Sequence, residues 1–143
     1  MNRFQRLVEL RQIREETAAN ALARVQGRIQ KTQEEIVGLD RETEAESRAA
    51  KENLASGCLL PPKMYEDFFR GQVWRRRRLE ERKSRLQVEA QVARQAWFEA
   101  RTLLQQAEKL ALKDDAARKV EARRKEGKEL DMAGILGASH SRL

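Results

Sequence analysis

Two stretches of seven-residue periodicity, separated by a single break, constrain this chain more than any other feature of its sequence. In the first stretch, small and apolar residues are spaced alternately three and four apart, at Leu22, Val25, Ile29, Thr32, Ile36, Leu39 and Thr43. This is the a/d spacing of a coiled coil, and it extends back with flaws to Phe4. Glu15 and Glu46 also fall on a/d positions, so we expect an imperfect seam.

The second stretch has the same period after the break. One set of seam positions is Tyr65, Gln72, Leu79, Leu86, Ala93, Ala100 and Ala107, and the companion set is Phe69, Arg76, Lys83, Ala90, Trp97, Leu104 and Ala111. The frequent alanines allow two helices to approach closely. The helical pattern persists to about Asp131.

The break between the two stretches contains the only prolines of the chain. Gly57 is suited to the left-handed conformation that ends a helix. Pro61 biases the preceding residue away from helix, and Pro62 can open the next helix because its missing N–H is not needed there. We therefore expect a helix over 3–56, a turn over 57–62 and a helix over 63–131.

A short turn between two helices that each carry an apolar stripe predicts an antiparallel arrangement. The expected fold is all-α: a long two-helix antiparallel coiled-coil hairpin over 1–131, followed by a flexible, frayed tail over 132–143. Folding about residues 59–60 pairs positions whose numbers add up to about 119. Leu22 then lies near Trp97 and Ile36 near Lys83, and 118–131 extends past the start of the first helix.

Composition excludes several classes of function. Of the 143 residues 37% are charged, against about 25% in ordinary globular domains, but the helical periodicity argues against disorder. One cysteine, Cys58, cannot form an internal disulfide, and one histidine, His140, has no partners for a zinc site or a catalytic triad. No signal segment and no apolar run of about 20 residues occur. We expect a soluble, intracellular, non-enzymatic protein without cofactor or metal.

Positive charge is concentrated in one short segment. Residues 70–85 hold eight basic and two acidic side chains, which accounts for most of the net charge of +7. Within this segment Trp74 is followed by four arginines, Arg75 to Arg78. Because consecutive helical residues are about 100° apart, we interpret the run as a solvated face or a contact for an acidic protein. Nucleic acid and an acidic membrane surface stay open as alternatives.

Aromatic residues cluster beside this charge, at Tyr65, Phe68, Phe69 and Trp74. They form either a hydrophobic plug that closes the hairpin or a binding surface. Phe68 and Phe69 are adjacent, so we expect at least one of them to face outward. Trp97 and Phe98 fit the seam and its edge, and Cys58 is expected to be an inert turn residue.

Three segments carry a resemblance to a known family. They are the arginine-studded start, Arg3 to Leu7 with Leu10 to Glu16 and the alanine-rich Ala18 to Ala23; Tyr65 to Phe68 after the turn; and the charged stretch Arg123 to Ala133. Over its whole length the chain resembles the FliJ family of flagellar type III export proteins, together with their YscO-type counterparts in virulence secretion.

The resemblance implies a cytoplasmic stalk, peripheral to the inner face of the cell membrane. It inserts the end that carries its termini into a hexameric export ATPase, contacts the export gate and escorts certain chaperones. The expected gate contact at the turn end comprises Tyr65, Phe68, Phe69, Gln72, Trp74, Arg76 and Arg77. The expected ATPase contact at the termini end comprises Arg3, Arg6, Arg11, Arg14, Arg118, Arg123, Arg124, Lys128, Leu130 and Asp131.

Two other interpretations belong to different classes. The chain could be a coiled-coil arm or adaptor that binds nucleic acid through 70–85, or a dimeric scaffold without a ring partner. The affinity of several arginines for phosphates falls steeply with ionic strength, so the salt dependence of binding would identify the nucleic-acid arm. The molecular mass in solution would identify the dimeric scaffold. By resemblance, no nucleic acid partner is expected.

Overall fold

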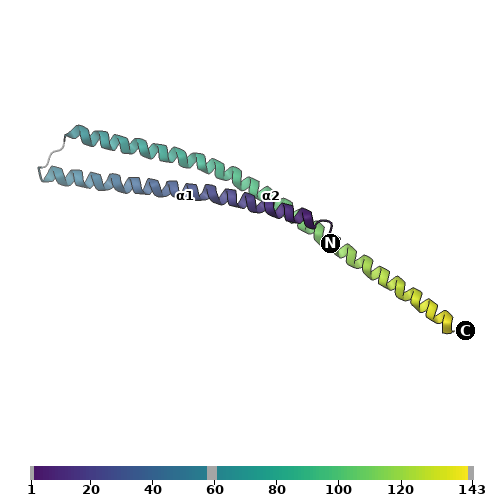
Figure 1. Cartoon of the computed structure of the whole chain (residues 1–143). Coiled ribbons are helices and arrows are strands. Elements are labelled where there is room, and N and C mark those ends of the chain that lie inside the picture. The colour runs from purple at the N-terminus through teal and green to yellow at the C-terminus, as the bar shows by residue number, and fades with distance from the viewer. Residues whose placement is uncertain (1, 58–60, 142–143) are drawn as a thin grey trace. The chain divides into compact units, whose positions relative to one another are not determined.

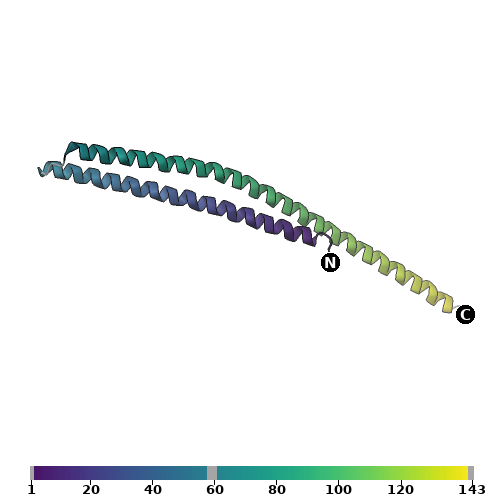
Figure 2. The same cartoon turned by 45° about the horizontal axis from the view of Figure 1, so that its top comes forward.

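The computed structural model describes residues 2–57 and 61–141 and contains two long helices. Helix α1 comprises Gln5–Ala55 and helix α2 comprises Pro62–Ser141, and no strand occurs among the described residues. The chain divides into two compact units: the turn unit, Thr17–Trp97, and the terminal unit, 1–16 with 98–143. Within each unit the two helices run side by side in opposite directions (Figure 1; Figure 2). The predicted all-α antiparallel hairpin is therefore confirmed.

Local chemistry explains where the helices begin and end. Before α1, the side-chain oxygen of Asn2 accepts a hydrogen bond from the Phe4 N–H at 2.8 Å, which caps an otherwise unpaired donor. After α1, Gly57 has a φ of 78°, the left-handed conformation that the sequence predicted. Pro62 opens α2. Cys58 and the rest of 58–60, which belong to the predicted turn, lie outside the described residues.

One stripe of side chains on α1 forms the contact with α2. Its less exposed positions follow the predicted spacing of three and four from Phe4 to Thr43, including the half-buried Glu15. The seam position predicted for Glu46 is wrong, because Glu46 is exposed and Ser47 is half-buried instead. The stripe takes two successive four-residue steps, from Leu39 to Thr43 and from Thr43 to Ser47. These steps shift the phase of the stripe, so the Glu46 carboxylate stays in water.

The stripe on α2 follows the prediction from Tyr65 to Ala111 with one exception. Arg76, predicted on the seam, is exposed and forms an ion pair with Asp40 of α1 at 2.9 Å. An arginine at the edge can keep its charge hydrated while its aliphatic part lies along the seam. Phe98 was predicted at the edge of the seam but is also exposed. It follows the half-buried Trp97 by one residue, or about 100° of helix rotation.

The pairing register differs from the prediction. In the turn unit the Gln72 amide donates to the Thr43 hydroxyl at 3.1 Å, and the Lys83 ammonium donates to the Gln33 side-chain oxygen at 2.7 Å. The residue numbers of these partners add up to 115 and 116, so the predicted value of about 119 is wrong by roughly one helical turn. Part of the difference comes from the helix ends, because the turn between Ala55 and Pro62 is centred at 58–59, about one residue earlier than predicted. Leu22 and Ile36 are displaced from their predicted partners accordingly.

Helix α2 continues ten residues beyond the predicted end at Asp131, to Ser141. Its two glycines in this part, Gly134 and Gly137, each cost only about 1 kcal/mol relative to alanine, and no proline follows Pro62. The predicted helix boundary is therefore wrong, while the flexibility of 132–143 stays a prediction. Over 115–137 every residue is exposed apart from the half-buried Gly127, and the part of α1 that belongs to the terminal unit does not run beside this segment (Figure 1; Figure 2).

Because few side chains are buried between the helices, the effect of a substitution on stability should depend strongly on whether the residue lies in the seam. Ile36 is only 2% exposed, whereas its neighbour Val37 lies at the surface. We expect Ile36→Ala to lower the free energy of unfolding by about 2–3 kcal/mol, through lost burial and a residual cavity. The matched control Val37→Ala should change it by less than about 0.5 kcal/mol. Urea denaturation followed by circular dichroism measures both, and equal effects would mean that the seam is placed on the wrong face.

Candidate protein-interaction surfaces

The candidate functional sites described below are surfaces of the two helices. Within 2–57 and 61–141, no group of three or more His, Cys, Asp and Glu side chains is arranged to hold a metal ion. In the same ranges, neither helix is long and apolar enough to cross a membrane. Cys58 and the side chain of His140 are outside the described part of the structure. The candidate surfaces of the two units are described separately.

An aromatic cluster lies at the start of α2 in the turn unit. The rings of Phe68 and Phe69 meet edge to face, with centroids 5.3 Å apart and planes at 76°. Both residues are half-buried, as is Tyr65, whose hydroxyl oxygen is buried without a hydrogen-bond partner in the described structure. Neither phenylalanine faces fully outward. Each keeps partial exposure, so the cluster combines the features of a plug with those of a contact surface.

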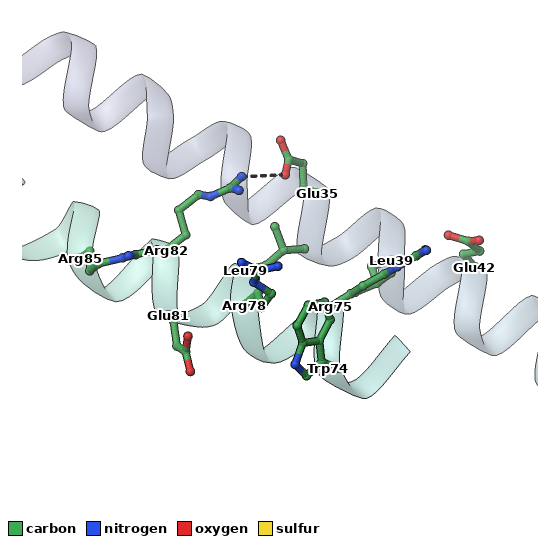
Figure 3. A pocket seen from close by; sticks show the side chains of 10 residues that line it. All are labelled: Glu35, Leu39, Glu42, Trp74, Arg75, Arg78, Leu79, Glu81, Arg82 and Arg85. Atoms are coloured by element: carbon green, nitrogen blue, oxygen red, sulfur yellow. Dashed lines mark ion pairs between the residues drawn. The ribbon is translucent and has the colours of Figure 1, made fainter. Parts of the chain in front are cut away.

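A groove between α1 and α2 in the turn unit, which we call the arginine groove, has a volume of about 600 Å³. Figure 3 shows its lining residues: Glu35, Leu39 and Glu42 from α1, and Trp74, Arg75, Arg78, Leu79, Glu81, Arg82 and Arg85 from α2. The half-buried Leu39 and Leu79 contribute apolar surface between the helices. The groove thus has an apolar centre with charged edges.

The charges of the arginine groove are only partly compensated. Arg82 forms an ion pair with Glu35 at 3.6 Å. Arg78 places its guanidinium 4.6 Å from the centre of the Trp74 ring, a cation–π contact. Arg75 and Arg85 form no ion pair with any acidic group of the described residues. Because Trp74 is 55% exposed, the groove presents an aromatic side chain beside unpaired guanidinium groups.

Sequence reasoning missed this groove because it considered the arginines as a consecutive run. The lining arginines are instead spaced three and four apart, at Arg75, Arg78, Arg82 and Arg85, and such residues share one side of a helix. Arg77, from the same run, contributes to a different shallow hollow with Glu80 and Ser84. The helical spacing within 70–85 is the signal that could have found the groove.

The predicted turn-end contact is only partly assembled. Trp74 lies in the arginine groove, but Gln72 is 3% exposed and bound to Thr43, so it has almost no surface to offer a partner. Arg76 lies between Asp40 at 2.9 Å and Glu80 at 3.3 Å. The hydrogen bond that Arg76 donates to the Asp40 carboxylate, together with the negative charges of Asp40 and Glu80, raises the pKa of Arg76 above its ordinary value. Arg76 is therefore already engaged within the hairpin.

In the terminal unit, the start of the chain is fixed to α2 by a group of contacts that we call the N-terminal clasp. The Asn2 amide donates to the Ala111 carbonyl and to the Asp115 carboxylate, each at 2.7 Å. Arg3 forms an ion pair with Asp114 at 3.5 Å. The clasp lies where the paired part of α2 ends.

The predicted ATPase-contact residues lie at the clasp and along both helices of the terminal unit. Arg3 and Arg118 both pair with Asp114, whose side chain is 13% exposed. Arg11 is half-buried in the seam. The other predicted residues are exposed: Arg6, Arg14, Arg123, Arg124, Lys128, Leu130 and Asp131. The structure therefore presents most of this set to solvent on the first turns of α1 and on the unpaired part of α2.

The clasp predicts a local effect on stability. Asn2→Ala removes the helix cap and both hydrogen bonds to α2, so we expect the opening free energy of the first turns of α1 to fall by about 1–2 kcal/mol. Hydrogen exchange over 4–12 measures this opening. The exposed Gln12→Ala serves as the control, since it should leave exchange unchanged. Unaltered exchange in Asn2→Ala would mean that the clasp does not hold the helix start.

Comparison with known proteins gives one result. A family model described as "Flagellar FliJ protein" matches residues 1–141, almost the whole chain. No curated protein and no solved structure matches it.

Proposed function

The chain belongs to the FliJ family, and on this premise we propose that it is the non-enzymatic central stalk of a type III export apparatus. Membership gives it a role related to flagellar protein export, as a structural or export component. In the proposal, the terminal unit inserts into the hexameric export ATPase, and the turn unit contacts the cytoplasmic part of the export gate. The protein would act in the cytoplasm at the inner face of the membrane and escort certain export chaperones.

The unpaired part of α2 is the observation that carries the ATPase assignment. Residues 118–131 hold six basic and four acidic side chains, all of them exposed, and no other helix of the terminal unit covers them (Figure 1). The exposed Arg6 and Arg14 of α1 add positive charge to the same unit. A single basic helix is narrow enough to enter a ring, and an acidic entrance would attract it.

The arginine groove and the aromatic cluster support a second contact on the turn unit. Protein interfaces combine an apolar centre with a polar rim, and aromatic and arginine side chains often dominate their binding energy. Trp74 with Leu39 and Leu79 would supply the centre, and Arg75 and Arg78 the rim. The gate contact as proposed therefore moves from Gln72 and Arg76 toward the groove, and it retains Tyr65, Phe68, Phe69 and Arg77 as neighbouring surface.

The ATPase assignment predicts the result of a truncation. Deleting 118–143 should reduce stimulation of the export ATPase to its basal rate, because the unpaired basic helix is lost. The paired part of the hairpin and the N-terminal clasp should remain, which the helical circular dichroism signal and the melting temperature would verify. Steady-state ATP hydrolysis with the assembled hexamer measures the effect. Full stimulation by a folded truncated protein would rule out the assignment.

The gate assignment predicts that Trp74 is an anchor. Trp74→Ala should weaken binding to the gate's cytoplasmic domain by about 1–3 kcal/mol, with little effect on the stability of the hairpin because the side chain is mostly exposed. Val73→Ala is the matched control, since Val73 is adjacent and also exposed. Isothermal titration calorimetry measures both affinities. Equal affinities for Trp74→Ala and the unaltered protein would exclude the groove as the gate contact.

A further inference from the structure

The four arginines that line the arginine groove repeat with the period of a coiled coil. Arg75 and Arg82 are seven residues apart, and so are Arg78 and Arg85. Seven residues are two turns of helix, or about 10.5 Å along α2, so the groove presents two pairs of guanidinium groups with the same axial spacing. From Arg75 to Arg85 the row extends over about 15 Å.

Acidic groups within the hairpin leave most of this row uncompensated. Arg75 and Arg85 form no ion pair with any described acidic residue. Arg82 has a single contact with Glu35, at 3.6 Å. Figure 3 shows the Glu81 side chain directed away from α1. The edge of the groove formed by α2 is therefore basic.

The rest of the groove has a different character. On the edge formed by α1, Glu35 and Glu42 are also seven residues apart. Between the two edges lie the half-buried Leu39 and Leu79, and Figure 3 shows Leu79 pointing from α2 toward α1. An occupant with complementary charge carries carboxylates toward α2, apolar side chains in the middle and no acidic row toward α1.

A helix is the element whose side chains match these spacings. Residues seven apart on a helix lie on one side of it, about 10.5 Å apart. On one face of a strand, side chains recur about every 6.7 Å, so a strand would be out of step with the second arginine of each pair by about 3 Å or more. Nucleic acid has phosphates for the arginines but no aliphatic side chains for Leu39 and Leu79.

We propose that the arginine groove binds an amphipathic helix of another protein. Its apolar stripe packs on Leu39 and Leu79, and its carboxylates, at seven-residue intervals, face the arginines of α2. The proposal rests on the proposed function, in which the cytoplasmic domain of the export gate contacts the turn unit, and it specifies the kind of segment that makes this contact. The bound helix lies along α2 and completes a three-helix coiled coil over 75–85.

Charge reversal at the two ends of the groove tests this lengthwise arrangement. Arg75→Glu and Arg85→Glu each replace an exposed arginine, so the hairpin should stay folded, which circular dichroism would verify. Each should weaken binding of the gate's cytoplasmic domain about tenfold or more in isothermal titration calorimetry, and the loss should shrink as the salt concentration rises. Arg94→Glu is the matched control with the same charge change. Arg94 is exposed and lies about 180° around α2 from Arg85, so its affinity should stay within about twofold of the unaltered protein.

Photo-crosslinking tests whether the occupant is a helix. The photoreactive residue p-benzoylphenylalanine is introduced at position 35 or at position 42, which leaves all four arginines intact. Crosslinks to the gate's cytoplasmic domain, located by mass spectrometry, should fall on partner residues about seven apart in a segment that carries carboxylates. Partner residues about three apart would indicate an extended chain, which covers the same 10.5 Å in three residues, and would overturn the proposal.

The outcomes separate this inference from the proposed gate contact. If Trp74→Ala weakens gate binding while Arg75→Glu and Arg85→Glu bind like Arg94→Glu, the gate contact stands and the acidic helix is wrong. If only one end variant loses affinity, the occupant does not lie along the groove, and the proposal fails. If the domain does not bind the unaltered chain, the gate contact and this inference both fail. Binding of a fluorescein-labelled DNA duplex more tightly than the gate domain, lost in both end variants and kept in Arg94→Glu, would assign the groove to nucleic acid and overturn the proposal.

Discussion

Each helix of this protein has a single neighbour, so each can bury only one stripe of side chains, and the rest of the structure depends on this constraint. The buried residues among those described are Thr32, Ile36, Gln72, Leu86, Ala90 and Ala107. None of them is a large aromatic side chain, because two helices cannot surround one. Stability is therefore spread along the seam in small contributions, and most side chains are left at the surface, where they are available for contacts with other molecules.

Polar groups within the narrow seam select one alignment of the helices. The alanine-rich stripe of α2 is similar at successive turns, so apolar packing alone would tolerate a slip by one turn. The hydrogen bonds from Gln72 to Thr43 and from Lys83 to Gln33 exist in only one register. Their net contribution to stability is modest, but a slipped pairing would leave the buried Gln72 amide without its partner. In the terminal unit, the N-terminal clasp imposes the same kind of restriction on the start of the chain.

The two units differ in the kind of surface they expose. The turn unit combines arginines with a mostly exposed tryptophan in a groove between two helices. The terminal unit presents a lone helix that is charged over 118–129 and then exposes the apolar side chains of Leu130, Met132, Ile135 and Leu136. A groove suits a partner that lies against it, and a lone helix suits a partner that surrounds it. These different geometries support the assignment of a different partner to each unit.

The sequence by itself determined the two helices, the turn at Gly57 and Pro62, the antiparallel pairing and nearly every seam position, because all of these depend on local conformational preference and helical periodicity. It also located the basic and aromatic segment that contains Trp74. Only the tertiary structure decided the register, the phase shift that exposes Glu46, the engagement of Arg76 by Asp40, and the hydrogen bond between Gln72 and Thr43. Each of these depends on which groups of the other helix lie opposite. The alanine-rich stripe of α2 does not by itself select these partners, because its pattern of small residues is nearly the same when the helix is shifted by one turn.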